Sequence, residues 1–332
     1  MTTTAPALPA DRRGARRRTA LVFISRYGTI LGLLLMIVGF TIARPTTFFT
    51  LPNFINILNQ SSLTAIIAAG LTMALVVGEF DLSIGYVASF AGLIVVGMIA
   101  RDSIPLLLAL PLVLLVGAAI GTVNGVLVTK VRINAVIATL GVGTILVGLG
   151  FAYSAFPIAS NVPTEFTQIA LGRWVFGIPN PIIIMIVVLT ILWIILNKTD
   201  LGQKMQAVGG NIEAARLSGI RVDRVKIFAF ATAGVCAALT GTILSSLLGS
   251  GTLAAADGYL LDAFAAVFLG SATLRDGEFH IIGTLIGVLI IAVGFNGLSI
   301  FGAPTFFQPI FKGAILVLAV GLSTLARRYS RA

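Results

Sequence analysis

The chain has 332 residues, of which 58% are hydrophobic and 10% are charged, and its formal net charge is +10. Soluble domains usually carry about 25% charged residues to solvate their surfaces, so this composition excludes a soluble enzyme, a nucleic-acid-binding domain and a disordered chain. The apolar residues fall in blocks of roughly 16 to 25, about the length that an α-helix needs to cross the hydrocarbon layer. The sequence therefore predicts an all-α polytopic membrane protein.

Apolar blocks predict about ten transmembrane helices, within a membrane domain at residues 27–328. The block at 259–273 is the weakest, because it is short and contains Asp262, and it suits a broken or tilted helix. Residues 1–26 are expected to form a flexible basic cytoplasmic tail, and 329–332 a second cytoplasmic tail. The expected spans are 28–43, 61–78, 84–100, 106–128, 133–155, 181–196, 227–248, 259–273, 280–300 and 309–326.

The basic residues indicate the orientation of these spans. With ten spans, 18 of the 22 lysines and arginines fall on the side of the N-terminus. Because short cytoplasmic loops are enriched in Lys and Arg, both termini are expected in the cytoplasm. The charge of +10 is thus explained by topology, and it predicts contact with membrane lipid and no nucleic-acid partner. The four exceptions are Arg44, Arg101, Arg173 and Lys312.

The residue types that hold metals are scarce. Cys236 is the single cysteine and His280 the single histidine, so no disulfide can form within the chain, and no metal site with several converging Cys or His ligands is expected. We interpret His280 as marking the end of a helix. No metal or cofactor is expected on this chain.

Two connections are long. Residues 156–180 contain three prolines, and Pro181 follows directly; these four prolines restrict the backbone of an external loop. Residues 197–226 form a cytoplasmic loop with six basic residues, in which Asn211 can cap a short helix, Glu213 favours its first turn, and Gly219 can end it. From the residues alone, this helix is either an ordinary amphipathic connector or an element that docks into a groove of a partner.

Several motifs resemble the permease subunits of ABC importers of the ribose type, over about residues 48–320. The segment from Gly209 to Ile220 is similar to their Glu-Ala-Ala coupling loop, and residues 78–85 to their signature Gly-Gly-Ile-Asp-Leu-Ser-Val-Gly. Three further matches are Asn124-Gly125-Val126-Leu127-Val128, Ile137-Ala138-Thr139-Leu140-Gly141 and the segment from Gly258 to Val267. The departures are Glu79-Phe80, where the family more often has Gly-Ile, and the segment 270–277, which has fewer glycines than usual.

The resemblance implies a monosaccharide permease of the bacterial inner membrane. The implied partners are a cytoplasmic ABC ATPase, a periplasmic or lipid-tethered sugar-binding protein, and a second permease, either a copy or a paralogue. The residues implied in coupling to the ATPase are Glu213, Ala214, Ala215, Arg216, Leu217, Ser218 and Gly219. The residues of the family signature are Gly78, Asp81, Leu82, Ser83 and Gly85.

The energy source is expected to lie on another chain. An ATPase needs a phosphate-binding loop in which Lys directly follows Gly. The five lysines here follow Thr129, Asn197, Gln203, Val225 and Phe311, so this sequence contains no such step. If transport is driven by ATP, then ATP and its Mg²⁺ are expected on the partner ATPase, and no enzymatic activity is expected on this chain.

Two carboxylates allow two interpretations each. Asp81, with Ser83, suits a cap for the helix that starts near Ile84, or it has a functional role beside Glu79. Asp262 lies inside a span, where acids are costly and often functional, so it is either paired structurally or placed on the substrate pathway.

Glycines and two asparagines suggest how the helices pack. Gly117, Gly121 and Gly125 recur every four residues, which allows close helix contact in lipid or simply reflects how common glycine is there. Asn124-Gly125 precedes Gly141 at the spacing with which Asn296-Gly297 precedes Gly313, an offset of 172 residues. We interpret this as the trace of an inverted repeat. Asn124 and Asn296 then either line the pathway or form interhelical hydrogen bonds.

Other functions are compatible with parts of the sequence. A permease of the same superfamily could carry a nucleoside, a signalling sugar or an amino acid. An ion-coupled secondary transporter would need ionisable groups in the membrane, and only Asp262 and Lys312 qualify. A membrane enzyme would need a cluster of His, Cys or acidic residues at one membrane face, which the composition disfavours.

Overall fold

The computed structural model describes residues 12–271, 277–315 and 317, with side chains from residue 27 onward. The described part of the chain is helical, apart from turns and two isolated β-bridges, and it confirms the expected all-α class. A further helical stretch covers residues 307–315. The named helices are α1 (Arg12–Ala43), α2 (Leu51–Val76), α3 (Ile84–Ala100), α4 (Leu106–Thr129), α5 (Ala135–Tyr153), α6 (Thr164–Leu171), α7 (Asn180–Lys198), α8 (Asp200–Gly210), α9 (Ile212–Leu217), α10 (Val222–Leu248), α11 (Asp257–Ser271) and α12 (Ile281–Ile300).

Six of the described helices, α2, α4, α5, α7, α10 and α12, are long and apolar enough to cross a membrane. Two shorter apolar stretches, Tyr27–Ala43 and Ile84–Ala100, coincide with expected spans. The helix α11 is a continuous helix of 15 residues at the place where a broken or tilted one was expected. The described residues therefore establish several membrane-spanning helices, whereas the full count of ten stays a prediction.

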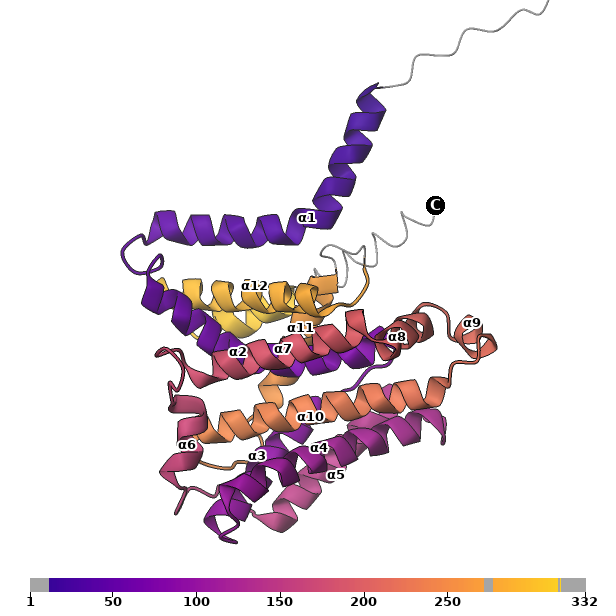
Figure 1. Ribbon diagram of the computed structural model, residues 1–332. Helices are drawn as coiled ribbons and strands as arrows, with labels where there is room; N and C mark the ends of the chain where they lie inside the picture. The colour runs from indigo at the N-terminus through magenta and orange to yellow at the C-terminus, as the bar shows by residue number, and fades with distance from the viewer. Residues whose placement is uncertain (1–11, 272–276, 316, 318–332) are drawn as a thin grey trace, which may run out of the picture.

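The helices α2 and α10 form the centre of the bundle. The helix α10 packs against α2, α3 and α4, while α2 packs against α7, α11 and α12, and α5 covers α3 and α4 on the outside (Figure 1). The helix α10 begins beside the short helix α9 and ends beside α6, and these two places mark opposite ends of the bundle (Figure 1). We call them the α9 end and the α6 end.

Glycines bring α4 into close contact with α10. A Cβ atom added at Gly117 would lie 3.1 Å from the carbonyl carbon of Gly234, and one added at Gly121 would lie 2.9 Å from Ala231 Cα. At Gly125 the distance to Ile227 Cα would be 2.7 Å. The four-residue spacing thus marks a face on which the two backbones nearly touch, as is typical of helix contacts in lipid.

The helix boundaries repeat at the offset already seen in the sequence. Shifted by 172 residues, α2 covers 223–248, α3 covers 256–272 and α4 covers 278–301, which nearly coincide with α10, α11 and α12. The packing repeats as well, because α4 lies on α10 and α12 lies on α2. Each set of helices therefore places its third helix against the first helix of the other set.

Three segments differ from the expected organisation. The helix α1 begins at Arg12, inside the segment 1–26 that was expected to be flexible, since Arg and Ala favour helix; residues 1–11 and the tail 329–332 lie outside the described residues. The external loop contains α6, whose Phe166 carbonyl accepts a hydrogen bond from the Ser246 hydroxyl of α10. The cytoplasmic loop contains a second helix, α8, which Thr199 caps.

Replacing Gly121 with Val should destabilise the protein by about 1–3 kcal/mol, because the added atoms have no space against the α10 backbone. The matched control is Gly148→Val in α5, where an added Cβ meets no atom within 4 Å. Thermal unfolding of the purified variants in detergent measures the difference. Equal unfolding temperatures for the two variants would contradict the packing described here.

Candidate functional site

The short helix α9 forms as expected. The Asn211 side chain accepts a hydrogen bond from the Ala214 N–H at 3.0 Å and caps the first turn. Arg216 and Glu213 form an ion pair at 3.4 Å along the helix. Gly219 has φ +80°, a conformation that residues with a Cβ atom rarely adopt, and the chain turns there toward α10.

The inner side of α9 anchors it to the bundle, while its other residues face outward. Ala215 is 3% exposed within the main hydrophobic core, and Ile212 and Ile220 pack against that core. Leu217 is 89% exposed, and Glu213 is also exposed. A partner that bound this outer surface would therefore press on a helix whose inner side is continuous with the core.

The helix α8 was not expected, although the Thr199-Asp200 step is typical of a helix start. The Thr199 hydroxyl accepts a hydrogen bond from the Gly202 N–H at 3.2 Å. At the other end of α8, a Cβ atom added at Gly209 would lie 3.0 Å from the carbonyl carbon of Val76. The segment before α9 is therefore in close contact with the end of α2.

The signature residues form a non-helical segment between α2 and α3. Gly78 has φ +82° and turns the chain. Asp81 Oδ1 accepts hydrogen bonds from the Ser83 N–H at 2.9 Å and from the Ser83 hydroxyl at 2.6 Å. Asp81 was expected to cap α3, but it bonds to Ser83, the residue before the helix. No side chain caps the first turn of α3 itself.

Three motifs that are far apart in the sequence meet at this segment. The Asn124 amide donates to the Ser83 hydroxyl at 2.8 Å, and the Thr139 hydroxyl accepts from the Leu82 N–H at 3.0 Å. Asp81 is 1% exposed, and Ser83, Asn124 and Thr139 are completely buried. The resemblance grouped these residues only by their order in the chain, whereas the fold joins them in one hydrogen-bond network.

Glu79, at one of the departures from the family signature, forms an ion pair with Lys226. Both side chains are largely buried, with 16% of Glu79 and 14% of Lys226 exposed. Lys226 lies in the first turns of α10, shortly after α9. This ion pair connects the signature segment to the helix that leads out of α9.

Asp262 of α11 forms an ion pair with Lys312 of the helical stretch 307–315. The side chains are 15% and 21% exposed, and the Lys312 ammonium also lies 5.6 Å from the centre of the Phe295 ring. Asp262 is therefore paired structurally, which was one of its two interpretations. Its partner is Lys312, the lysine inside the last expected span.

Asp262 also lines a cavity of about 310 Å³. The walls come from α2, α6, α7, α10, α11 and α12, and include Pro181 at the start of α7 and Leu247 at the end of α10. These positions place the cavity toward the α6 end of the bundle. The other two candidate pathway residues, Asn124 and Asn296, do not line it.

Asn296 instead forms a reciprocal amide pair with Asn53 near the start of α2. Each amide donates to the carbonyl of the other, at 3.0 and 2.8 Å. Asn124 and Asn296 therefore both form hydrogen bonds to other parts of the bundle. This is the second of the two roles that the sequence allowed them.

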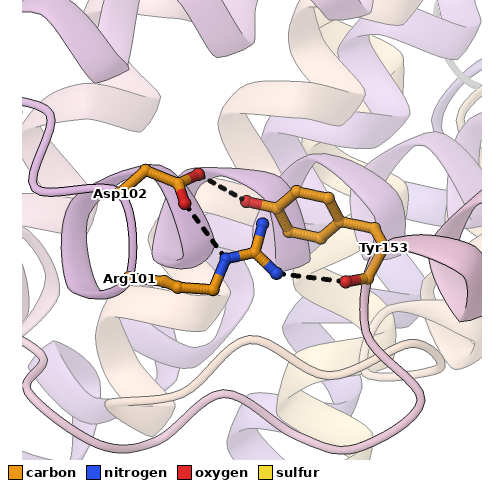
Figure 2. Close-up of polar contacts among 3 residues, drawn as sticks. All are labelled: Arg101, Asp102 and Tyr153. Carbon is orange, nitrogen blue, oxygen red and sulfur yellow. Dashed lines mark hydrogen bonds and ion pairs between the residues drawn. The ribbon is translucent and has the colours of Figure 1, made fainter.

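The α6 end carries an exposed polar cluster that links the ends of α3 and α5 (Figure 2). Arg101 bonds to Asp102 at 3.0 Å and to the Tyr153 carbonyl at 3.1 Å, while the Tyr153 hydroxyl bonds to Asp102 at 3.2 Å. The Arg101 guanidinium lowers the pKa of the Asp102 carboxyl below its ordinary value of 3.8. Because a lowered pKa favours the charged form, this link persists above about pH 4 and is lost only on acidification.

Comparison with known proteins identifies the class of this bundle. The family model for permease components of branched-chain amino acid transport systems matches residues 53–320, and the chain belongs to this family. It is therefore a multi-pass membrane transport subunit.

The chain is 38% identical to the ribose import permease protein of Haemophilus influenzae, over 90% of this chain and 93% of the relative. It is 39% identical to the ribose import permease protein of Bacillus subtilis, over 90% and 92%. An L-arabinose ABC transporter permease protein of Azospirillum brasilense is 32% identical, over 99% and 96%. No solved structure shows a significant match.

Replacing Asp262 with Asn should lower the stability by up to about 3 kcal/mol, because Lys312 is left without its counter-charge in a largely buried place. Exchanging the two residues, Asp262→Lys with Lys312→Asp, should recover most of the loss. As a control, Asp223→Asn removes the exposed pair with Lys130 and should cost about 0–1 kcal/mol. Unfolding temperatures in detergent report all three; an Asp262→Asn protein as stable as the control would refute the pairing.

Proposed function

We propose that the chain forms the translocation pathway of an ATP-driven importer for a monosaccharide. The observation that carries the proposal is the similarity, over at least 90% of the chain, to ribose import permease proteins, together with a D-allose permease protein at 32% identity. The family description refers to branched-chain amino acids, so an amino acid remains the main competing substrate, followed by a nucleoside or a signalling sugar. The named sugar relatives favour a monosaccharide.

ATP hydrolysis takes place on a separate cytoplasmic ABC subunit, which holds ATP and Mg²⁺, and this chain acts without a cofactor of its own. The ATPase binds the outer surface of α9 from Glu213 to Gly219. Support for this comes from the outward-facing Glu213, Arg216 and Leu217 on a helix whose inner side is anchored in the core. Docking of this kind needs a helix that is both accessible and firmly connected.

A binding protein in the periplasm, free or tethered to lipid, delivers the sugar to the α6 end. A second permease, either a copy or a paralogue, completes the transporter. The exposed apolar surface of α4 and α5, which includes Leu107, Leu115 and Ile145, is available to lipid or to that second permease. No nucleic acid is involved.

The topology that fits these partners has ten spans in the bacterial inner membrane. Both termini and the α9 end face the cytoplasm, and the α6 end faces outward. The distribution of Lys and Arg supports this orientation.

The ten spans contain an inverted repeat. Its two units are α2 to α5, and α10 to the helical stretch that begins at residue 307. Support comes from the offset of 172 residues, which relates the helix boundaries and also Asn124 to Asn296. Transporters built in this way usually bind their substrate near the interface of the repeats, and the cavity beside α2, α10, α11 and α12 has contacts with both units.

Coupling runs from α9 to the signature segment. When the ATPase subunits close, they displace α9, and the rigid turn at Gly219 passes the movement to α10. Lys226 then moves the signature segment through Glu79, and Ser83 carries the change to α4 through Asn124. The bundle reopens outward as a result.

An ion-coupled transporter is the competing mechanism. The two ionisable groups that it could use, Asp262 and Lys312, neutralise each other. Purified permease, ATPase and binding protein in proteoliposomes should take up radiolabelled D-ribose only with ATP. Uptake driven by a proton or sodium gradient without ATP would refute the proposal, and a panel with L-arabinose, D-allose, leucine and adenosine would identify the substrate.

Replacing Gly219 with Val should reduce ATP-dependent uptake by at least about tenfold, because Val strains the turn at φ +80° that carries the movement. Gly219→Asn is the matched control, since Asn tolerates this conformation better than other residues. Uptake and ATP hydrolysis are measured on the assembled complex. Full uptake by the Val variant in an intact complex would contradict the role of α9.

A further inference from the structure

We propose that the cavity at the α6 end is a binding site for one monosaccharide within a single permease subunit, with Asn59, Thr64, Tyr259 and Asp262 as its polar contacts. This inference deepens the proposed function and depends on it for the class of substrate. It assigns a sugar site inside the bundle and names the residues that form it.

The cavity has the size of a small-molecule site. Its volume of about 310 Å³ lies at the lower end of the range of about 300–1,000 Å³ that is typical of ligand pockets. This space is large enough for a single sugar ring. The cavity also lies toward the end of the bundle that faces outward in the proposed topology.

The lining combines polar and apolar side chains. Six polar side chains contribute to it: Asn59, Gln60, Ser61, Thr64, Tyr259 and Asp262. Hydroxyl, amide and carboxylate groups provide both donors and acceptors, as the hydroxyl groups of a sugar require. The rings of Tyr259 and Phe295 add apolar faces against which the C–H groups of a sugar can pack.

One lining residue carries a buried acceptor without a partner. Asn59 Oδ1 makes no hydrogen bond within the described part of the chain. A buried acceptor without a donor is costly, and a rotation of the Asn59 side chain toward the cavity would let a ligand hydroxyl satisfy it. The neighbouring Ser61 hydroxyl, by contrast, is already bonded to the Leu58 carbonyl at 3.1 Å.

The ion pair with Lys312 suits Asp262 for a neutral ligand. Because Lys312 balances its charge, the carboxylate can accept hydrogen bonds from hydroxyl groups without attracting a cation. A lipid acyl chain is the other candidate occupant for a cavity in a membrane protein. Three of the six polar side chains already have protein partners: Gln60 bonds to Asn56, Ser61 to Leu58 and Asp262 to Lys312. An acyl chain would still leave the buried Asn59 acceptor without a donor, which is unfavourable, so the lining favours a sugar.

Cysteine labelling tests the site. Thr64→Cys and Asn59→Cys are reacted with a charged, membrane-impermeant methanethiosulfonate added from outside, in the assembled complex in proteoliposomes. The native Cys236 is buried and gives a low background. Ser160→Cys, in the exposed segment between α5 and α6, is the matched control for reactivity from outside.

We expect D-ribose to slow labelling at Thr64→Cys and Asn59→Cys by about tenfold at about ten times its dissociation constant, because only the unoccupied fraction reacts. Sucrose should not slow it, and neither sugar should affect Ser160→Cys. Absent labelling, labelling that ribose does not slow, or equal protection by sucrose would overturn the site. Gln60→Cys at the exposed edge of the cavity replaces any variant that fails to assemble.

Uptake by proteoliposomes that carry the unsubstituted permease separates this inference from the proposed function. Ribose uptake without protection refutes the cavity as the site and leaves the function intact. Protection without ATP-dependent uptake supports the site and refutes the proposed function.

Discussion

A stretch of backbone that is not helical, inside a membrane bundle, must find its hydrogen bonds within the protein. The segment from Gly78 to Ser83 meets this constraint with side chains from other helices: Thr139 accepts from the Leu82 N–H, and Asn124 holds the Ser83 hydroxyl. These bonds fix where α3 begins, and with it the positions of the helices that pack on α3. Because α3 packs on α10, the position of this central helix depends in part on the same polar network.

Sequence reasoning located the features that depend on near neighbours in the chain. A cap such as Asn211 and a turn such as Gly219 are specified by a few adjacent residues, and the glycines of α4 show their common face through their spacing alone. The short helix α8 was missed, because its apolar residues are few and the basic residues around it suggested a loop. His280 was expected at the end of a helix because the chain has too few Cys and His residues for a metal site, and it lies at the start of α12, where its side chain accepts from the Gly283 N–H.

The contacts between distant residues could not be predicted. Nothing in the order of residues says that Glu79 faces Lys226, or that Asp262 faces Lys312, because those pairs arise only when separate helices are packed. The cavity has the same origin, since its walls belong to six helices. The sequence could assign a carboxylate in a membrane helix to pairing or to a pathway. The fold shows Asp262 paired with Lys312 and on the wall of a cavity, while its place on a pathway stays a proposal.

In the two related sets of helices, α2 to α4 and α10 to α12, the third helix of each set packs on the first helix of the other. This arrangement has a consequence for biosynthesis. The glycine face of α4 is complementary to α10, and α12 is complementary to α2. The ribosome synthesises α4 well before α10, so the glycine face of α4 has no partner helix until α10 has been inserted into the membrane. The chain can reach its final packing only after the second set has been inserted, and a fragment that stops before α10 would expose that surface to other proteins and to the proteases that remove incomplete chains.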